Sequence, residues 1–160
     1  APVTVSGATW SPNTITYSGN NRTHMIRVPG PGRFELRLMD GATNPYLLQA
    51  GIIAAGLDGI EKNRNPGKPL YINMYEESHK AKGAKKLPSS IEKALKHLNS
   101  SKVLNSAFGK SVISSYIKLK NKEINKYNSS MTKKLGFRGN KKNYKTNIIT
   151  QWEKDNTLDC

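Results

Sequence analysis

The sequence has one cysteine and no long apolar run. Cys160 cannot form an internal disulfide, so we expect a reducing compartment, the cytoplasm. The longest apolar stretch, residues 46–60, is too short to span a membrane and contains Gln49 and Asp58. No basic start followed by an apolar segment is visible, so we expect no signal peptide. These absences argue against a disulfide-stabilised secreted domain and against a membrane partner.

Acidic residues are also few: the sequence has 11 Asp and Glu against 26 Lys and Arg, which gives a net charge of +15. Such an excess is typical of proteins that bind nucleic acid. Nearly all of it lies in residues 61–160, where lysine and asparagine are abundant together. Both residues have A-rich codons, so base composition explains much of the charge. We therefore favour a solvated lysine surface, and a basic nucleic-acid-binding module is the alternative.

Lysine is absent from residues 1–60, yet four of the six arginines lie there, at positions 22, 27, 33 and 37. A guanidinium is a planar fork that matches phosphate or carboxylate oxygens in pairs, whereas an ammonium is a point charge. One acid, Glu35, lies among these arginines. The combination indicates a site for an anionic substrate and a metal, and the alternative is a set of surface ion pairs on strands.

Residues 33–38 alternate between charged and apolar side chains, as in a half-buried strand. One face carries Phe34, Leu36 and Leu38, and the other carries Arg33, Glu35 and Arg37. Side chains two residues apart on such a face are separated by roughly 6.5–7 Å. Glu35 could therefore hold a cation while Arg37 holds an oxyanion beside it.

The order of patterns predicts an α+β fold, with residues 1–40 as strands and residues 44–60 as a helix. Residues 14–17 and 23–28 read as the strands of a hairpin around residues 18–21, because Gly and Asn tolerate positive φ. Asn44 and Pro45 are typical of a helix start. The helix that follows is apolar almost all round, so we expect it to be buried against the strands.

Residues 61–130 read as a connection followed by helices. Residues 63–88 look irregular, Ser89 or Ser90 caps a short helix, and a longer helix covers residues 110–127. Residues 131–147 read as a basic, insertion-like loop, and residues 150–155 could form a final helix. No nucleophile triad, phosphate-binding glycine loop or Cys–His metal motif is present, and we interpret His24 as structural.

Four ordered blocks resemble the C-terminal part of glutamine synthetase, closest to the variant labelled type III. They are Asn21-Arg-Thr-His-Met-Ile-Arg-Val-Pro, Arg33-Phe-Glu-Leu-Arg-Leu, Asn44-Pro-Tyr and Ala54-Ala-Gly-Leu-Asp-Gly-Ile. The resemblance implies a partial catalytic domain of an ATP-dependent ligase, which makes glutamine from glutamate and ammonia through γ-glutamyl phosphate. A relative that uses methylamine and makes a γ-glutamylamide is the alternative within the family.

The resemblance also implies roles for single residues. Arg22 matches an arginine that meets the transferring phosphate and the substrate, and Arg37 one that meets the substrate γ-carboxylate. Arg27 matches an arginine that holds ATP phosphates, and Arg33 matches a basic position on the nucleotide side. Glu35 matches a ligand of Mg²⁺ or Mn²⁺, the metal that bridges the ATP phosphates. Tyr75 aligns with a tyrosine that some bacterial relatives modify. The resemblance further implies a homo-oligomer of the dodecamer type at full length.

The resemblance covers about the last third of such an enzyme. The other metal-binding carboxylates and the ammonia site of the family lie outside these residues. Since one carboxylate cannot bind a catalytic pair of cations well, we expect residues 1–160 to be inactive alone and to act as part of a longer chain.

Overall fold

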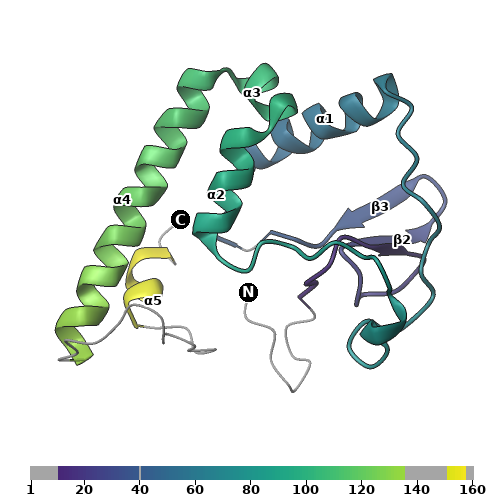
Figure 1. Ribbon diagram of the computed structural model, residues 1–160, viewed down its shortest axis with the longest axis horizontal. Helices are drawn as coiled ribbons and strands as arrows, with labels where there is room; N and C mark the ends of the chain where they lie inside the picture. Colours follow the sequence, from purple (N-terminus) through teal and green to yellow (C-terminus); the bar gives the residue numbers. More distant parts are fainter. Residues whose placement is uncertain (1–10, 40, 136–150, 158–160) are drawn as a thin grey trace. The chain divides into compact units, whose positions relative to one another are not determined.

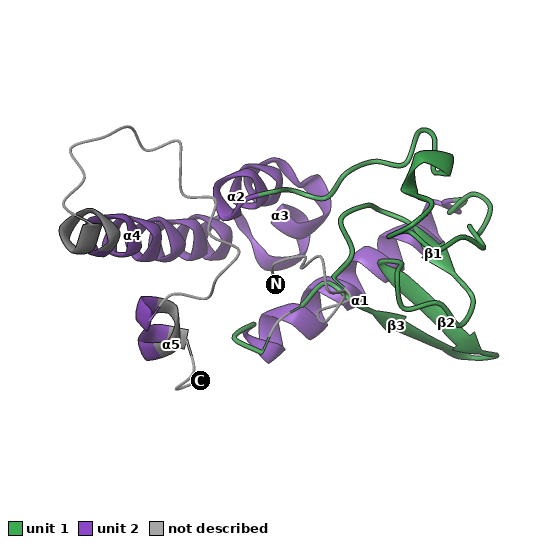
Figure 2. Cartoon of the chain, turned by 90° about the horizontal axis from the view of Figure 1, so that it is seen from below, with its two compact units in different colours: residues 1–43, 65–89 green, residues 44–64, 90–160 purple. Residues whose placement is uncertain are grey.

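The computed structural model describes residues 11–39, 41–135 and 151–157. The chain forms two compact units, shown in Figure 2. Unit 1 comprises Ala1–Thr43 with Asn65–Ser89 and carries the strands, whereas unit 2 comprises Asn44–Arg64 with Ser90–Cys160 and is helical. The predicted α+β class is confirmed. No helix among the described residues is long and apolar enough to cross a membrane.

Unit 1 contains a three-stranded sheet in the order β1-β2-β3, with all three strands labelled in Figure 2 and β2 and β3 labelled in Figure 1. Its strands are β1 (Tyr17–Ser18), β2 (Ile26–Gly30) and β3 (Arg33–Leu36). β1 pairs with β2 in parallel, so the predicted hairpin around residues 18–21 is wrong. The hairpin is formed one step later by β2 and β3, which are antiparallel. Gly32, with φ of 69°, supplies the left-handed conformation of that turn.

The chain between β1 and β2 does not form a hairpin turn, because residues 21–24 are bonded to a distant segment. Asn21 Nδ2 donates to the carbonyl of Ile72 at 2.9 Å, and the amide of Met74 donates to Thr23 Oγ1 at 3.0 Å. The ring of His24 is fully buried and bonds to Thr16 Oγ1 and to the Ile72 carbonyl. The structural interpretation of His24 is confirmed.

The helix predicted over residues 44–60 is α1 (Pro45–Glu61). Asn44 caps it as predicted, since its Oδ1 accepts from the amides of Tyr46 and Leu47, both at 3.0 Å. The expected burial is wrong for the described chain: no residue of α1 is buried, and Tyr46 is 82% exposed. The neighbouring α3 (Lys102–Phe108) contacts α1 but has only seven residues, too few to cover an all-round apolar surface.

The remaining helices lie in unit 2, except for the short η1 (Ser78–Lys80) in unit 1. Ser90 caps α2 (Ile91–Ser100), as predicted, and α5 (Gln151–Thr157) is the expected final helix. α3, which Ser101 caps, was not predicted. Leu95 of α2 and Ile113 of the long α4 (Lys110–Leu135) are the buried apolar residues of this unit among those described.

The long helix α4 spans Lys110–Leu135 and is longer than predicted. Residues 131–135, expected to be part of a basic loop, are helical because no glycine or proline interrupts the chain between Gly109 and Gly136. The rest of that predicted loop lies outside the described residues. Tyr127 of α4 meets Trp152 of α5 edge to face, with ring centroids 5.3 Å apart.

Candidate functional site

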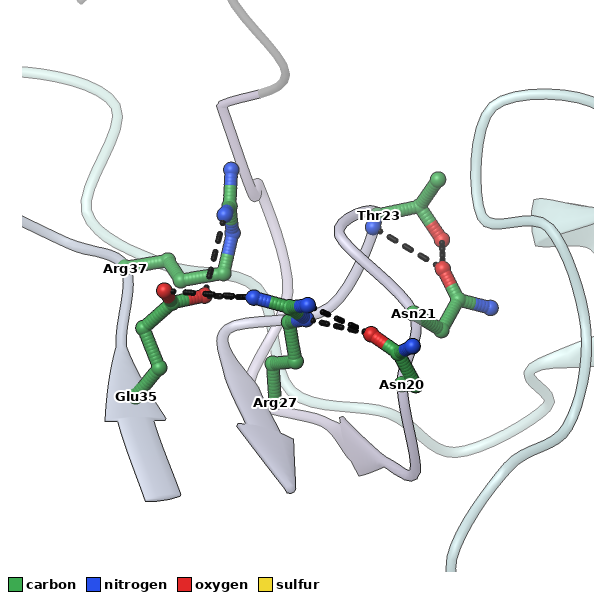
Figure 3. A network of polar contacts seen from close by, with 6 residues as sticks. All are labelled: Asn20, Asn21, Thr23, Arg27, Glu35 and Arg37. Carbon is green, nitrogen blue, oxygen red and sulfur yellow. Dashed lines mark hydrogen bonds and ion pairs between the residues drawn. The ribbon is translucent and has the colours of Figure 1, made fainter. Parts of the chain in front are cut away.

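The antiparallel pairing of β2 with β3 sets Arg27 directly opposite Glu35. Arg27 Nη1 donates to Glu35 Oε2 at 3.1 Å and to Oε1 at 3.3 Å. Arg37, which follows β3, donates from Nη1 to the same Oε2 at 3.3 Å. Figure 3 shows both guanidinium groups turned toward this carboxylate. We call Arg27, Glu35 and Arg37 the arginine–glutamate cluster.

Within the cluster, the carboxylate is the accessible group. The side chains of Arg27 and Arg37 are 12% and 17% exposed, whereas that of Glu35 is 44% exposed. The hydrogen bond from Arg27 is the largest influence on Glu35 and lowers its pKa; burial opposes it, and Arg37 lowers the pKa further. Glu35 is therefore ionised at neutral pH, between two largely covered cations.

The ion pairs expected under the alternative interpretation are thus present. They are not ordinary surface pairs, because both arginine side chains are mostly covered, whereas the side chain of Glu35 is 44% exposed. Two positive groups and one negative group leave the cluster with a net positive charge. That net positive charge favours the binding of an anion.

Asn20 completes the surroundings of Arg27. Its Oδ1 accepts from Nε of Arg27 at 2.8 Å and from Nη2 at 2.5 Å. Figure 3 shows Arg27 held between Asn20 and Glu35. Sequence reasoning assigned Asn20 only to a turn. The contact depends on the parallel pairing of β1 with β2, which the local pattern did not indicate.

Arg22 and Arg33, the other two candidate residues, do not join the cluster. Both are exposed, Arg22 in the segment before the buried His24 and Arg33 at the first position of β3. In the described part of the chain, neither side chain has a hydrogen bond or ion pair. Their guanidinium forks therefore have all their donors available to a ligand.

Glu35 has the right chemistry for a hard cation but supplies only one side chain. The described residues contain no group of three or more His, Cys, Asp or Glu side chains that could hold a metal. An exposed carboxylate can give one oxygen to Mg²⁺ or Mn²⁺ when phosphates and water complete the coordination. Glu35 fits that role, as one ligand among several.

Tyr75 lies in unit 1, near enough to Arg37 for their charges to interact. Its hydroxyl donates to the carbonyl of Ser11 at 3.2 Å. Burial raises the pKa of this phenol, and the charge of Arg37 acts in the opposite direction. Modification of Tyr75 stays a prediction from the sequence.

Residues 5–135 match the family model of the glutamine synthetase catalytic domain. The chain belongs to the glutamine synthetase family. It is 52% identical over 159 residues to glutamine synthetase of Rhizobium leguminosarum bv. phaseoli, covering 99% of this chain and 32% of that protein. It is 45% identical over 126 residues to glutamate–methylamine ligase of Methyloversatilis universalis, covering 77% of this chain and 28% of that protein. The chain thus spans about a third of the length of these relatives.

Solved structures from the glutamine synthetase family agree with this assignment. A GmaS/ADP complex superposes with a TM-score of 0.73 at 48% identity and covers the whole of this chain and 33% of its own. GmaS without ligand gives a TM-score of 0.67 at 43% identity and covers 94% of this chain and 31% of its own. Residues 27, 35 and 37 lie within the matched range, so the arginine–glutamate cluster belongs to a catalytic domain of the glutamine synthetase family.

Proposed function

We propose that the whole protein is a glutamate–ammonia ligase, which uses ATP to form glutamine through γ-glutamyl phosphate. In this proposal, β2 and β3 carry one side of the phosphoryl-transfer site. The observation that carries it is the arginine–glutamate cluster, because it combines two anion-binding forks with one exposed, ionised carboxylate. Family membership supplies the reaction class.

Phosphoryl transfer from ATP to the γ-carboxylate of glutamate spreads negative charge over several oxygens, so fixed positive groups accelerate it. Arg37 would hold the γ-carboxylate oxygens as they become an acyl phosphate, and Arg27 would hold the ATP phosphates. Each already directs Nη1 toward Glu35. The pairing thereby fixes the direction of each guanidinium group relative to the carboxylate.

The exposed arginines fit the nucleotide side of the same reaction. Arg22 would meet the transferring phosphate, and Arg33 would meet the nucleotide phosphates. Glu35 would give one oxygen to the Mg²⁺ or Mn²⁺ that accompanies ATP, and that cation would neutralise phosphate charge when bound. Since Glu35 is the one metal-ligand candidate of this cluster, we infer that activity requires the whole protein.

A second candidate differs only in the acceptor: a glutamate–methylamine ligase that forms γ-glutamylmethylamide. The similarity to the Methyloversatilis universalis enzyme and to the GmaS structures supports it. The larger identity to the Rhizobium leguminosarum bv. phaseoli enzyme favours ammonia.

The test is ADP formation by the whole protein with ATP, Mg²⁺ and glutamate, with ammonium or methylamine as acceptor. Mass spectrometry of the amide product identifies the acceptor used. A higher kcat/KM for ammonium supports the first proposal, and a higher value for methylamine supports the second. Glutamate-independent ADP formation, or none with either acceptor, overturns both.

We also infer that the whole protein is a homo-oligomer of the dodecamer type and that it is cytoplasmic. A native mass measurement would check the oligomeric state.

A further inference from the structure

We propose that Asn20 is a positioning residue, which holds Arg27 in the orientation that keeps the Glu35 carboxylate open to a ligand. The inference rests on the proposed function, because it assigns the ligand to the phosphoryl-transfer site. It adds a residue outside the charged set, from the loop that joins β1 to β2.

The geometry of the contact is specific. A guanidinium can present its Nε and Nη2 edge to one acceptor pair, and in Arg27 a single oxygen, Asn20 Oδ1, takes both of these donors. The other end of the group, Nη1, is thereby left to face Glu35. Arg27 is mostly covered, whereas Asn20 is exposed, so the contact lies at the rim of the cluster.

The backbone around Asn20 is anchored on both sides. The preceding carbonyl, of Gly19, accepts from the amide of Val28 in β2 at 3.1 Å and from that of Asn21 at 2.7 Å. The following residue, Asn21, is bonded to Thr23 and to the Ile72 carbonyl. Asn20 therefore has a fixed starting point from which its side chain reaches Arg27.

The consequence concerns how Arg27 can bind Glu35. The strongest arginine–carboxylate geometry uses two parallel N–H donors, and the Nε and Nη2 edge is well suited to it. If that edge were free, Arg27 could turn it to Glu35 and give each carboxylate oxygen an N–H donor of its own. With Asn20 in place, both oxygens of Glu35 share the single Nη1 of Arg27, and Oε1 has only this 3.3 Å contact among the described residues, so the side chain stays 44% exposed. Asn20 thus keeps an oxygen of Glu35 available to the cation that accompanies ATP.

The test compares Asn20→Ala, Asn20→Asp and the control Asn125→Ala in the whole protein. Asp retains the acceptor oxygen that Arg27 uses, whereas Ala removes it. The control removes an exposed asparagine from α4, and no hydrogen bond of its side chain is present among the described residues. We measure KM for MgATP, KM for glutamate, kcat and the melting temperature.

Asn20→Ala should raise KM for MgATP by about tenfold, as expected for a lost hydrogen bond to a charged group, with KM for glutamate unchanged. Asn20→Asp should restore KM for MgATP to near the wild-type value, and Asn125→Ala should not alter it. An unchanged KM in Asn20→Ala, a failure of Asn20→Asp to restore it, or a loss of folding in Asn20→Ala overturns the inference. A wild-type protein without ligase activity overturns the proposed function instead.

Discussion

Replacement of His24 by leucine tests the contact that holds residues 21–24 against residues 72–74. His24 is fully buried, with Nδ1 3.0 Å from Thr16 Oγ1 and Nε2 2.9 Å from the Ile72 carbonyl oxygen. Since a carbonyl only accepts, Nε2 donates to it, and Nδ1 of the neutral ring accepts from the hydroxyl of Thr16. Leucine fills similar space but makes neither bond.

The loss of stability depends on which hydrogen bonds the two partners of His24 keep after the substitution. The Ile72 carbonyl still accepts from Asn21 Nδ2, so losing the hydrogen bond from His24 should cost about 0.5–1.5 kcal/mol, as for an ordinary hydrogen bond. Thr16 is only 8% exposed, and its hydroxyl would be left without this partner, at a cost of about 1–3 kcal/mol. Together, His24→Leu should destabilise this part of unit 1 by about 1.5–4.5 kcal/mol.

Amide hydrogen exchange in the whole protein reads this local stability directly. The amide of Met74, which donates to Thr23 Oγ1, should exchange at least about tenfold faster in His24→Leu. The control is His97→Leu, which removes an exposed histidine from α2 and should leave that amide unchanged. If the Met74 amide exchanges at the wild-type rate in His24→Leu, the assignment of His24 as the residue that joins these segments is refuted.

Three further changes test the charged residues and the helix start. Arg27→Gln removes the largest cause of the lowered Glu35 pKa, so a carboxyl NMR titration should show it rising toward 4.5. In the wild type, the ion-pair contribution to stability is present above pH 4.5 and is lost as the pH falls through the lowered pKa. Arg22→Lys keeps the charge but loses the fork, so KM for ATP should rise by about tenfold, and an unchanged KM would exclude Arg22 from the nucleotide site. Asn44→Ala should cost about 1 kcal/mol at the start of α1, with faster exchange of first-turn amides, whereas Asn44→Asp should keep them protected.

Local signals in the sequence were sufficient for several elements. Asn44 and Pro45 predicted the start of α1, since capping depends on residues within one turn. The alternation of residues 33–37 set Glu35 and Arg37 on one side of a strand, where they do meet. Ser90 similarly predicted the start of α2.

Non-local contacts were beyond such signals. The Gly and Asn residues at positions 19–21 suit a hairpin turn, but the bonds from residues 21–24 to residues 72–74 lead the chain into a parallel pairing instead. The role of Asn20 depends on that pairing. The apolar pattern of α1 indicated burial. Burial, however, also depends on how much surface the neighbouring elements offer to cover the helix, and the sequence of the helix does not give that.

The most direct test of the proposed site is the rate of glutamate-dependent ADP formation by Glu35→Gln in the whole protein, titrated with Mg²⁺. Gln keeps the size of the side chain and one oxygen but loses the charge that the cation requires. The account predicts a loss in kcat of at least about 100-fold at saturating Mg²⁺. The control is Glu92→Gln on α2, a carboxylate outside the arginine–glutamate cluster, and it should retain wild-type activity. A kcat within twofold of wild type for Glu35→Gln, with wild-type Mg²⁺ dependence, would contradict the proposal that Glu35 is a metal ligand at the phosphoryl-transfer site.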